Sequence, residues 1–254
     1  MALTGEEEVA EVPEIAEPTF VFHQVPGCGS RELVELVYAK FAVVHDEPDA
    51  FGGAPVAGEA VMPLDTRWLS AAKLFLFRSH FRPGSVYIDK VYPEFFENDR
   101  FKVFLFVDEP LRLAAVTYLH VSRGPNAGEV GTFAEFLDAR SNPMAFFLGA
   151  TRANYRSLLE RYFFVGVNQK KAASLGALLR AMTGVIEAAG DSPNVLRTAY
   201  QLRRESSEAV DAAREVEGLM GSVGWLARTR FLSRNLLDWQ IYRAAVRRLS
   251  EEMG

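Results

Sequence analysis

The chain contains 254 residues, of which 49% are hydrophobic and 24% are charged. This length and apolar content are sufficient to bury the core of one α/β domain. The single cysteine excludes a disulfide framework, and four scattered histidines offer no metal-ligand spacing, so we predict no metal site. No apolar run approaches the roughly 20 residues that span a bilayer, and the acidic N-terminus is unlike a signal peptide. We therefore expect a cytoplasmic protein that does not insert into membranes.

Negative charge is concentrated at the N-terminus, where residues 1–18 contain six Glu and no basic residue. Removing these six charges from the net charge of −5 leaves +1 on residues 19–254. A nearly neutral domain lacks the basic bias of nucleic-acid-binding proteins, so we expect no nucleic-acid partner. The Glu, Pro and Ala content of residues 1–18 is typical of a disordered acidic tail, with a docking peptide as the alternative. We expect one domain to follow, over residues 19–254.

Apolar runs typical of buried strands recur along the domain, at residues 19–22, 73–77, 102–107 and 162–165. Each run is followed by a helix-compatible stretch or a polar loop. This alternation predicts an α/β fold in which a largely parallel sheet is covered by helices on both faces. Residues 45–63 are rich in Gly and Pro and are predicted to form a long loop, which is either a lid or a plain insertion.

Residues 190–254 are predicted to form a helical C-terminal part. Apolar residues recur there at near-helical spacing within residues 194–221 and again within residues 232–249. Such stripes usually pack on the domain's own core. The alternative is that the first stripe is buried on another chain, so contact with a protein partner or self-association through residues 194–249 stays open.

A strand, a Gly-rich turn and an amphipathic helix are predicted over residues 19–41. This arrangement aims backbone N–H groups and the positive end of a helix dipole at one point, where an anion would bind. The turn lacks the Lys-Ser/Thr pair of a Walker loop, which argues against a nucleoside kinase or an ATPase. Its residues are Pro26, Gly27, Cys28, Gly29, Ser30 and Arg31.

This turn resembles the first motif, H-x-x-P-K-T/C-A/G-G-T-S-L, of the sulfotransferases that use 3′-phosphoadenosine 5′-phosphosulfate (PAPS), particularly the carbohydrate group. The motif's Lys falls on Gly27, and the matching positions are His23, Pro26, Cys28, Gly29 and Leu33. The resemblance implies a P-loop-like sulfotransferase fold, a three-layer structure with extra C-terminal helices. It also implies that PAPS, or its product PAP, would bind at residues 26–31.

Five further blocks continue the resemblance in the same order as in the family. His80 stands in the place of a Gly-His-Phe motif, and residues 101–123 resemble the strand and helix that hold the 3′-phosphate, with the phosphate-binding Arg falling on Asp108. Residues 133–149, 162–179 and 235–249 resemble an acidic helix with N-x-x-T-R, a late strand and helix, and a closing N-x-x-D-x-x-L-Y helix. The resemblance therefore spans nearly the whole domain.

The mismatches are selective, because apolar and turn positions are retained whereas positions that would grip nucleotide or substrate are changed. The changed positions hold Gly27, Asp108, Leu113, Val116, Phe146 and Gln169. An Asp in place of an Arg reverses the charge where a phosphate dianion would dock. We therefore predict a degenerate bacterial member of the family, a pseudoenzyme that serves as a non-catalytic binding or scaffold module without a certain cofactor.

The alternative is an active bacterial sulfotransferase that moves a sulfuryl group from PAPS to a glycan or small-molecule hydroxyl. Arg31 would then replace the missing Lys and stabilise developing charge, and His80 would be the general base. The structural interpretation is a solvated Arg31 and a His80 bonded to backbone. We expect His23 to be structural. Asp108 and Glu109 are either an acid-base pair or carboxylates at a helix N-terminus.

Overall fold

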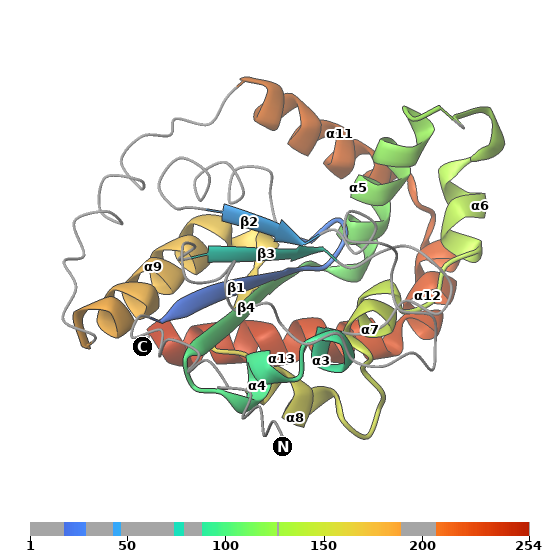
Figure 1. Cartoon of the computed structure of the whole chain (residues 1–254). Helices are drawn as coiled ribbons and strands as arrows, with labels where there is room; N and C mark the ends of the chain where they lie inside the picture. The colour runs from blue at the N-terminus through green and yellow to red at the C-terminus, as the bar shows by residue number, and fades with distance from the viewer. Residues whose placement is uncertain are drawn as a thin grey trace, which may run out of the picture.

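A parallel sheet forms the centre of the domain (Figure 1). The computed structural model describes residues 18–28, 43–46, 74–78, 88–125, 127–188 and 207–253. The strands are β1 (Thr19–Gln24), β2 (Val43–Asp46), β3 (Leu74–Arg78), β4 (Phe101–Val107) and β5 (Phe164–Val167). Their order is β2-β3-β1-β4-β5, and every neighbouring pair is parallel. The predicted α/β class with a parallel sheet is confirmed.

The central strands are buried on both faces, which is why they are apolar without alternation. β4 has the sequence FKVFLFV, and apart from Lys102 all of its residues are buried. Such continuous apolar runs are typical of parallel strands that are covered on both sides. Phe22 of β1 and Phe104 of β4 stack with ring centroids 5.1 Å apart, so aromatic contacts also join these two strands.

Strand β2 was not predicted. It begins before the loop expected at residues 45–63 and includes the first two residues of that range, His45 and Asp46. The prediction failed because β2 has only four residues, and a short strand at the sheet edge carries little hydrophobic signal. Residues 47–63 lie outside the described residues.

Ten described α-helices surround or extend the sheet. They are α3 (Ile88–Val91), α4 (Glu94–Glu97), α5 (Pro110–Ser122), α6 (Phe133–Asp138), α7 (Pro143–Leu148), α8 (Tyr155–Glu160), α9 (Lys171–Ala188), α11 (Ser207–Ser222), α12 (Trp225–Arg234) and α13 (Leu236–Met253). Short 3₁₀ turns cover Ala127–Glu129 and Asn168–Lys170. None of the helices in the described ranges is long and apolar enough to cross a bilayer.

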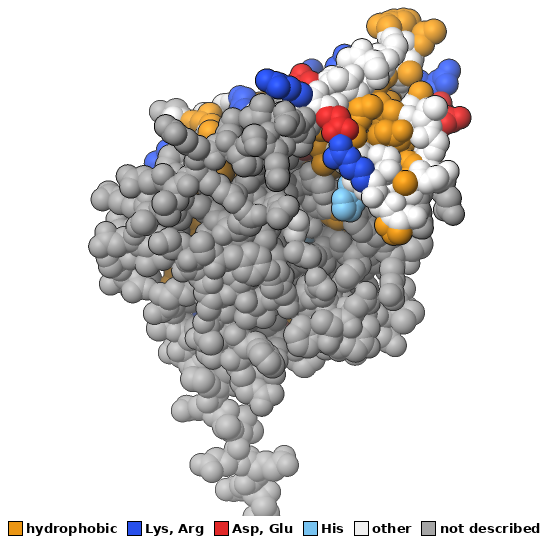
Figure 2. Space-filling model, turned by 90° about the horizontal axis from the view of Figure 1, so that it is seen from above, with side chains coloured by type: hydrophobic (Ala, Val, Ile, Leu, Met, Phe, Trp, Pro, Cys, Tyr) orange, Lys and Arg blue, Asp and Glu red, His pale blue; other side chains and the backbone are white. Residues whose placement is uncertain are grey.

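The late helices bury their apolar stripes within the domain. Ile241, Ala245 and Leu249 of α13 are fully buried, and α13 contacts β5. Val216 of α11 packs against α5, and Arg123 at the end of α5 forms an ion pair with Glu215 of α11. Over α5, α6 and α11, Figure 2 shows basic and acidic side chains close together. Packing on the domain's own core, the expected default, therefore holds for Val216 and Leu249, whereas Ala213 of the first stripe and Leu236 of the second are exposed.

Candidate functional site

The carboxyl ends of β1, β4 and β5 bring three segments of the chain to one edge of the sheet. Gly27 and Cys28 follow β1, Asp108 follows β4, and Asn168 follows β5. In Figure 1 the strand arrows point toward this edge, on the side where α5, α7 and α12 lie. Ligands of open α/β sheets bind outside the carboxyl ends of the strands. We call this group of residues the carboxyl edge.

The turn after β1 closes on itself. The backbone N–H of Cys28 donates to the carbonyl of Val25 at 2.9 Å, and Gly27 has φ +75°. With Pro26 before a glycine of positive φ, this pattern is typical of a type II turn. The Cys28 N–H is thus engaged by the protein rather than free for an anion. Gly29, Ser30, Arg31 and His80, four of the predicted site residues, lie outside the described residues.

Gly27 leaves no space for the side chain that the resemblance places there. A Cβ atom at this position would lie 2.5 Å from Leu113 Cδ1 and 3.3 Å from Thr117 Oγ1 of α5. The positive φ would strain any other residue as well. A lysine at position 27 would therefore require the Leu113 side chain to shift and the turn to hold a strained backbone conformation.

Cys28 is fully buried beside the carboxyl edge, and the backbone of Asp108 hydrogen-bonds to it. Burial, together with the carboxylates of Asp108 and Asp238, raises the pKa of the Cys28 thiol. A neutral, buried thiol is a poor nucleophile. Cys28 therefore acts as a small packing residue of the turn.

Asp108 holds a local ion pair at the position where the resemblance places a phosphate-binding Arg. Its carboxylate is fully buried and accepts hydrogen bonds from Arg112 Nη1 at 2.5 Å, Asn168 Nδ2 at 3.0 Å and the Glu109 backbone N–H at 2.8 Å. Burial raises the pKa of Asp108, while the charge of Arg112 and the hydrogen bond from Asn168 oppose that shift. These donors satisfy the carboxylate within the protein.

Glu109 begins helix α5. Its Oε2 atom accepts from the backbone N–H of Arg112 at 2.9 Å, and Pro110 occupies the first helical turn. These are the features of a capped helix start, so the helix N-terminus interpretation is confirmed for Glu109. Burial raises the pKa of Glu109, and Arg228 of α12 acts in the opposite direction.

Other changed motif positions have taken roles inside the domain. Leu113 is buried against the Gly27 turn, and Val116 packs in the cluster between α5 and α11. Gln169 accepts a hydrogen bond from the hydroxyl of Tyr242 on α13. Phe146, by contrast, is exposed on α7.

Sequence reasoning did not assign Asn168, Trp239 or Tyr242 to this edge. Tyr242 lies near the acidic pair, because Glu109 and Asp108 contribute to the burial-driven rise of its pKa. Trp239 packs edge-to-face on Tyr242 with ring centroids 5.6 Å apart. Both aromatic residues were predicted to belong to an apolar stripe that packs on the core. Their i, i+3 spacing places them on one face of α13 but does not show whether that face lines the core or a ligand site.

Two polar atoms in this region are buried without a hydrogen-bond partner among the residues described. They are Nε1 of Trp239 and Oε1 of Gln24, the last residue of β1. Buried polar groups are nearly always hydrogen-bonded in native proteins.

His23 is a structural residue, as expected. It is buried in β1, its Nδ1 lies 2.8 Å from the hydroxyl of Tyr162, and burial lowers its pKa to about 3. The ring is therefore neutral at physiological pH.

The polar residues that match the family motifs form a second network, whose Asp238 lies close enough to Cys28 of the carboxyl edge to affect the thiol pKa. Asp238 accepts from the backbone N–H groups of Met144 at 3.1 Å and Ala145 at 2.8 Å, which caps α7. Asn142 Oδ1 accepts from the backbone N–H groups of Leu237 and Asp238, which caps α13 in return. Asn235 Oδ1 accepts from the Asn142 backbone N–H at 2.6 Å. We call Asn142, Asn235 and Asp238 the helix junction.

No group of three or more His, Cys, Asp or Glu within the described ranges is arranged to hold a metal ion.

No family model and no curated protein matches the sequence. Among solved structures, the chain is similar to mouse sulfotransferase SULT7A1 complexed with PAP, with 11% identity, a TM-score of 0.38, and coverage of 82% of this chain and 67% of that chain. It is also similar to a sulfotransferase from Alicyclobacillus acidocaldarius, with 14% identity, a TM-score of 0.38, and coverage of 84% of this chain and 99% of that chain. Similarity at this level is too distant to transfer an activity or a ligand.

Proposed function

We propose that this protein is a sulfotransferase-like binding or scaffold module that does not use PAPS. Asp108 carries the proposal, because its buried carboxylate stands where the motif resemblance places the Arg for a phosphate. The carboxyl edge would then serve a partner protein or an altered ligand rather than the nucleotide.

The electrostatic balance at Asp108 supports this choice. Two unit charges 4 Å apart interact by about 4 kcal/mol at an effective dielectric constant of 20. A phosphate at that distance from Asp108 would be repelled by an energy of this order, and the single positive charge of Arg112 does no more than offset that repulsion. The Asp108–Arg112 pair thus offers a phosphate no net positive charge.

The closed turn is a second support for the proposal. In a phosphate-binding loop, several backbone N–H groups and a cation converge on the anion. Here the Cys28 N–H is used within the turn, and Leu113 fills the space beside Gly27 where a cationic side chain would pass.

The second candidate function is an active sulfotransferase that transfers a sulfuryl group from PAPS to a glycan or small-molecule hydroxyl, with Arg31 as the cation and His80 as the base. Arg112 favours this candidate, because its side chain remains 24% exposed and could release Asp108 to grip an anion. Positioned cations are a large part of catalysis when charge develops on a leaving group.

The test is the melting temperature of the full chain with and without millimolar PAP, with ATP as the control nucleotide. A ligand at about 100 times its dissociation constant stabilises a protein by roughly 2.7 kcal/mol, which raises the melting temperature of a domain of this size by several degrees. We expect no PAP-specific shift. A shift with PAP but not with ATP would reject the proposal in favour of the enzyme.

A further inference from the structure

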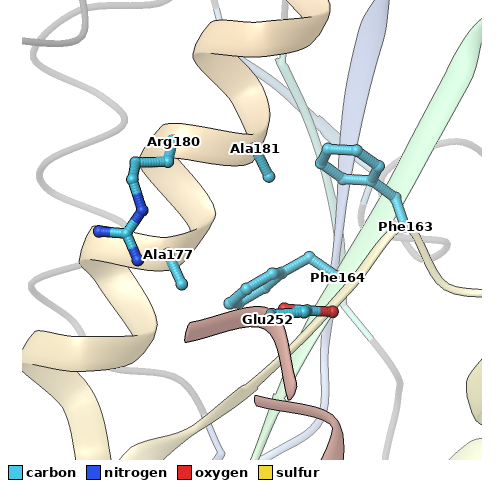
Figure 3. A pocket seen from close by; sticks show the side chains of 6 residues that line it. All are labelled: Phe163, Phe164, Ala177, Arg180, Ala181 and Glu252. Carbon is cyan, nitrogen blue, oxygen red and sulfur yellow. The ribbon is translucent and has the colours of Figure 1, made fainter. Parts of the chain in front are cut away.

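A hollow of about 440 Å³ opens at the amino end of β5, between α9 and the last turn of α13 (Figure 3). The carboxyl edge follows the other end of the same strand, so the two regions are separate. Six side chains line the hollow, namely Phe163, Phe164, Ala177, Arg180, Ala181 and Glu252.

The small side chains of α9 account for the hollow. Ala177 and Ala181 are one helical turn apart and therefore share a face of α9. In Figure 3 their methyl groups and the rings of Phe163 and Phe164 border a common space. Phe164 is buried in the core, and Phe163 contacts Phe20 of β1 with ring centroids 6.1 Å apart. Both rings are thus held by the sheet and form an apolar wall.

The charges at the rim are unequal. Glu252 Oε1 is paired with Arg248 Nε at 2.9 Å. The Arg248 guanidinium is itself fixed, because it donates to the backbone carbonyls of Leu159, Tyr162 and Phe163. Arg180, on the opposite side, forms no ion pair with another residue in the described part of the chain. The unpaired charge at the rim is therefore positive.

We propose that this hollow binds a small apolar carboxylate, whose aryl or alkyl body lies against the partly exposed Phe163 ring and Ala181 methyl group. Its carboxylate accepts hydrogen bonds from the Arg180 guanidinium, whose planar fork matches a carboxylate. The volume is within the range of small-molecule pockets, and an apolar wall with one oriented charge is their usual composition. An apolar amine fits less well, because Arg248 already pairs with Glu252, the anion at the rim.

Ligand-observed NMR titration of the full chain with phenylacetate tests the proposal, and phenylacetamide serves as the neutral probe of equal shape. We expect phenylacetate to bind roughly tenfold or more tightly than the amide, because charge-assisted hydrogen bonds contribute more than neutral ones. Arg180→Gln should remove this preference. Arg243→Gln, which changes an exposed arginine of α13 that does not line the hollow, should leave it intact.

A second variant tests the location. Ala181→Leu places a larger side chain in the hollow and should abolish binding of phenylacetate, with folding checked by circular dichroism. The proposal is overturned if phenylacetate does not bind the wild type, if the amide binds equally well, if Arg180→Gln and Arg243→Gln behave alike, or if a folded Ala181→Leu variant still binds. If Ala181→Leu does not fold, the proposal is tested by the Arg180→Gln titration and by the comparison of phenylacetate with phenylacetamide.

Discussion

The carboxyl edge and the helix junction are both polar and buried, yet they relate to the motif resemblance in opposite ways. At the helix junction, Asn142, Asn235 and Asp238 keep the motif residues and join helix ends more than 90 residues apart. At the carboxyl edge, Gly27 and Asp108 replace the motif residues. The retained residues hold helix ends together, whereas the replaced residues stand at positions that, by the resemblance, would hold a ligand.

Both regions satisfy the same physical requirement, because buried polar groups need partners. At the helix junction the partners are the free backbone N–H groups of two helix starts, which no other part of a helix can satisfy. At the carboxyl edge the partners of Asp108 are its neighbour Glu109, Arg112 one helical turn later, and Asn168. The Asp108 carboxylate is thus satisfied without a ligand.

The largest effect is expected from Asp238→Ala at the helix junction. The change leaves the backbone N–H groups of Met144 and Ala145 buried without acceptors, so we expect a loss of about 3 kcal/mol in the free energy of unfolding. Urea denaturation measures it. Asp138→Ala is the matched control, because the Asp138 carboxylate is half exposed and its ion pairs should contribute less than about 1 kcal/mol. Equal losses in the two variants would contradict a structural role for the junction.

The pH dependence of the free energy of unfolding tests the burial of Asp238 at the helix junction. Burial raises the pKa of Asp238 to about 7, above its ordinary value, so the folded protein holds this proton where the unfolded chain has lost it. Between about pH 4 and pH 7 the contribution of Asp238 to stability should therefore fall as the pH rises. Asp238→Asn should remove this component, so the difference in stability between wild type and variant should shift in favour of the variant toward pH 7. A difference that is constant across this range would show that Asp238 does not titrate in it.

A smaller effect is expected from Gly27→Ala at the carboxyl edge. Positive φ and the contact with Leu113 should together cost about 2 kcal/mol in the free energy of unfolding. Gly218→Ala in α11 is the control, because a Cβ there meets no atom within 4 Å and alanine favours a helix by roughly 0.5–1 kcal/mol. Thermal or urea denaturation of both variants checks the difference. If Gly27→Ala is as stable as the wild type, the turn and Leu113 accommodate a side chain at position 27 without cost, which would contradict the account of this turn.

The sheet was predictable from the sequence because its central strands are apolar on both faces, as in β1 and β4. The position of the turn at Pro26 and Gly27 was also predicted correctly. Proline and glycine favour the backbone dihedral angles of a tight turn, so the pair after a strand indicates one. The edge strand β2 escaped prediction because four residues carry too little periodicity.

The partners at the carboxyl edge were less predictable. The pair of Asp108 with Arg112 is an i, i+4 contact and is readable in principle once α5 is recognised. Asn168 and Tyr242 reach the same place only through the packing of β5 and α13, which sequence spacing does not encode. The positive φ of Gly27 likewise depends on the folded turn. The sequence therefore indicates that the motif lysine is missing, but it does not reveal the strain that a side chain would meet at this position.

The central claim is that the Asp108 carboxylate closes the carboxyl edge to the nucleotide. Isothermal titration calorimetry of PAP into wild type and Asp108→Asn tests it most directly, because the isosteric change removes the negative charge and frees Arg112. We predict no measurable binding to the wild type and measurable binding to the variant, since a repulsion of about 4 kcal/mol corresponds to a gain of several hundredfold in affinity. Equal isotherms for the two proteins, whether both bind PAP or neither does, would contradict the claim.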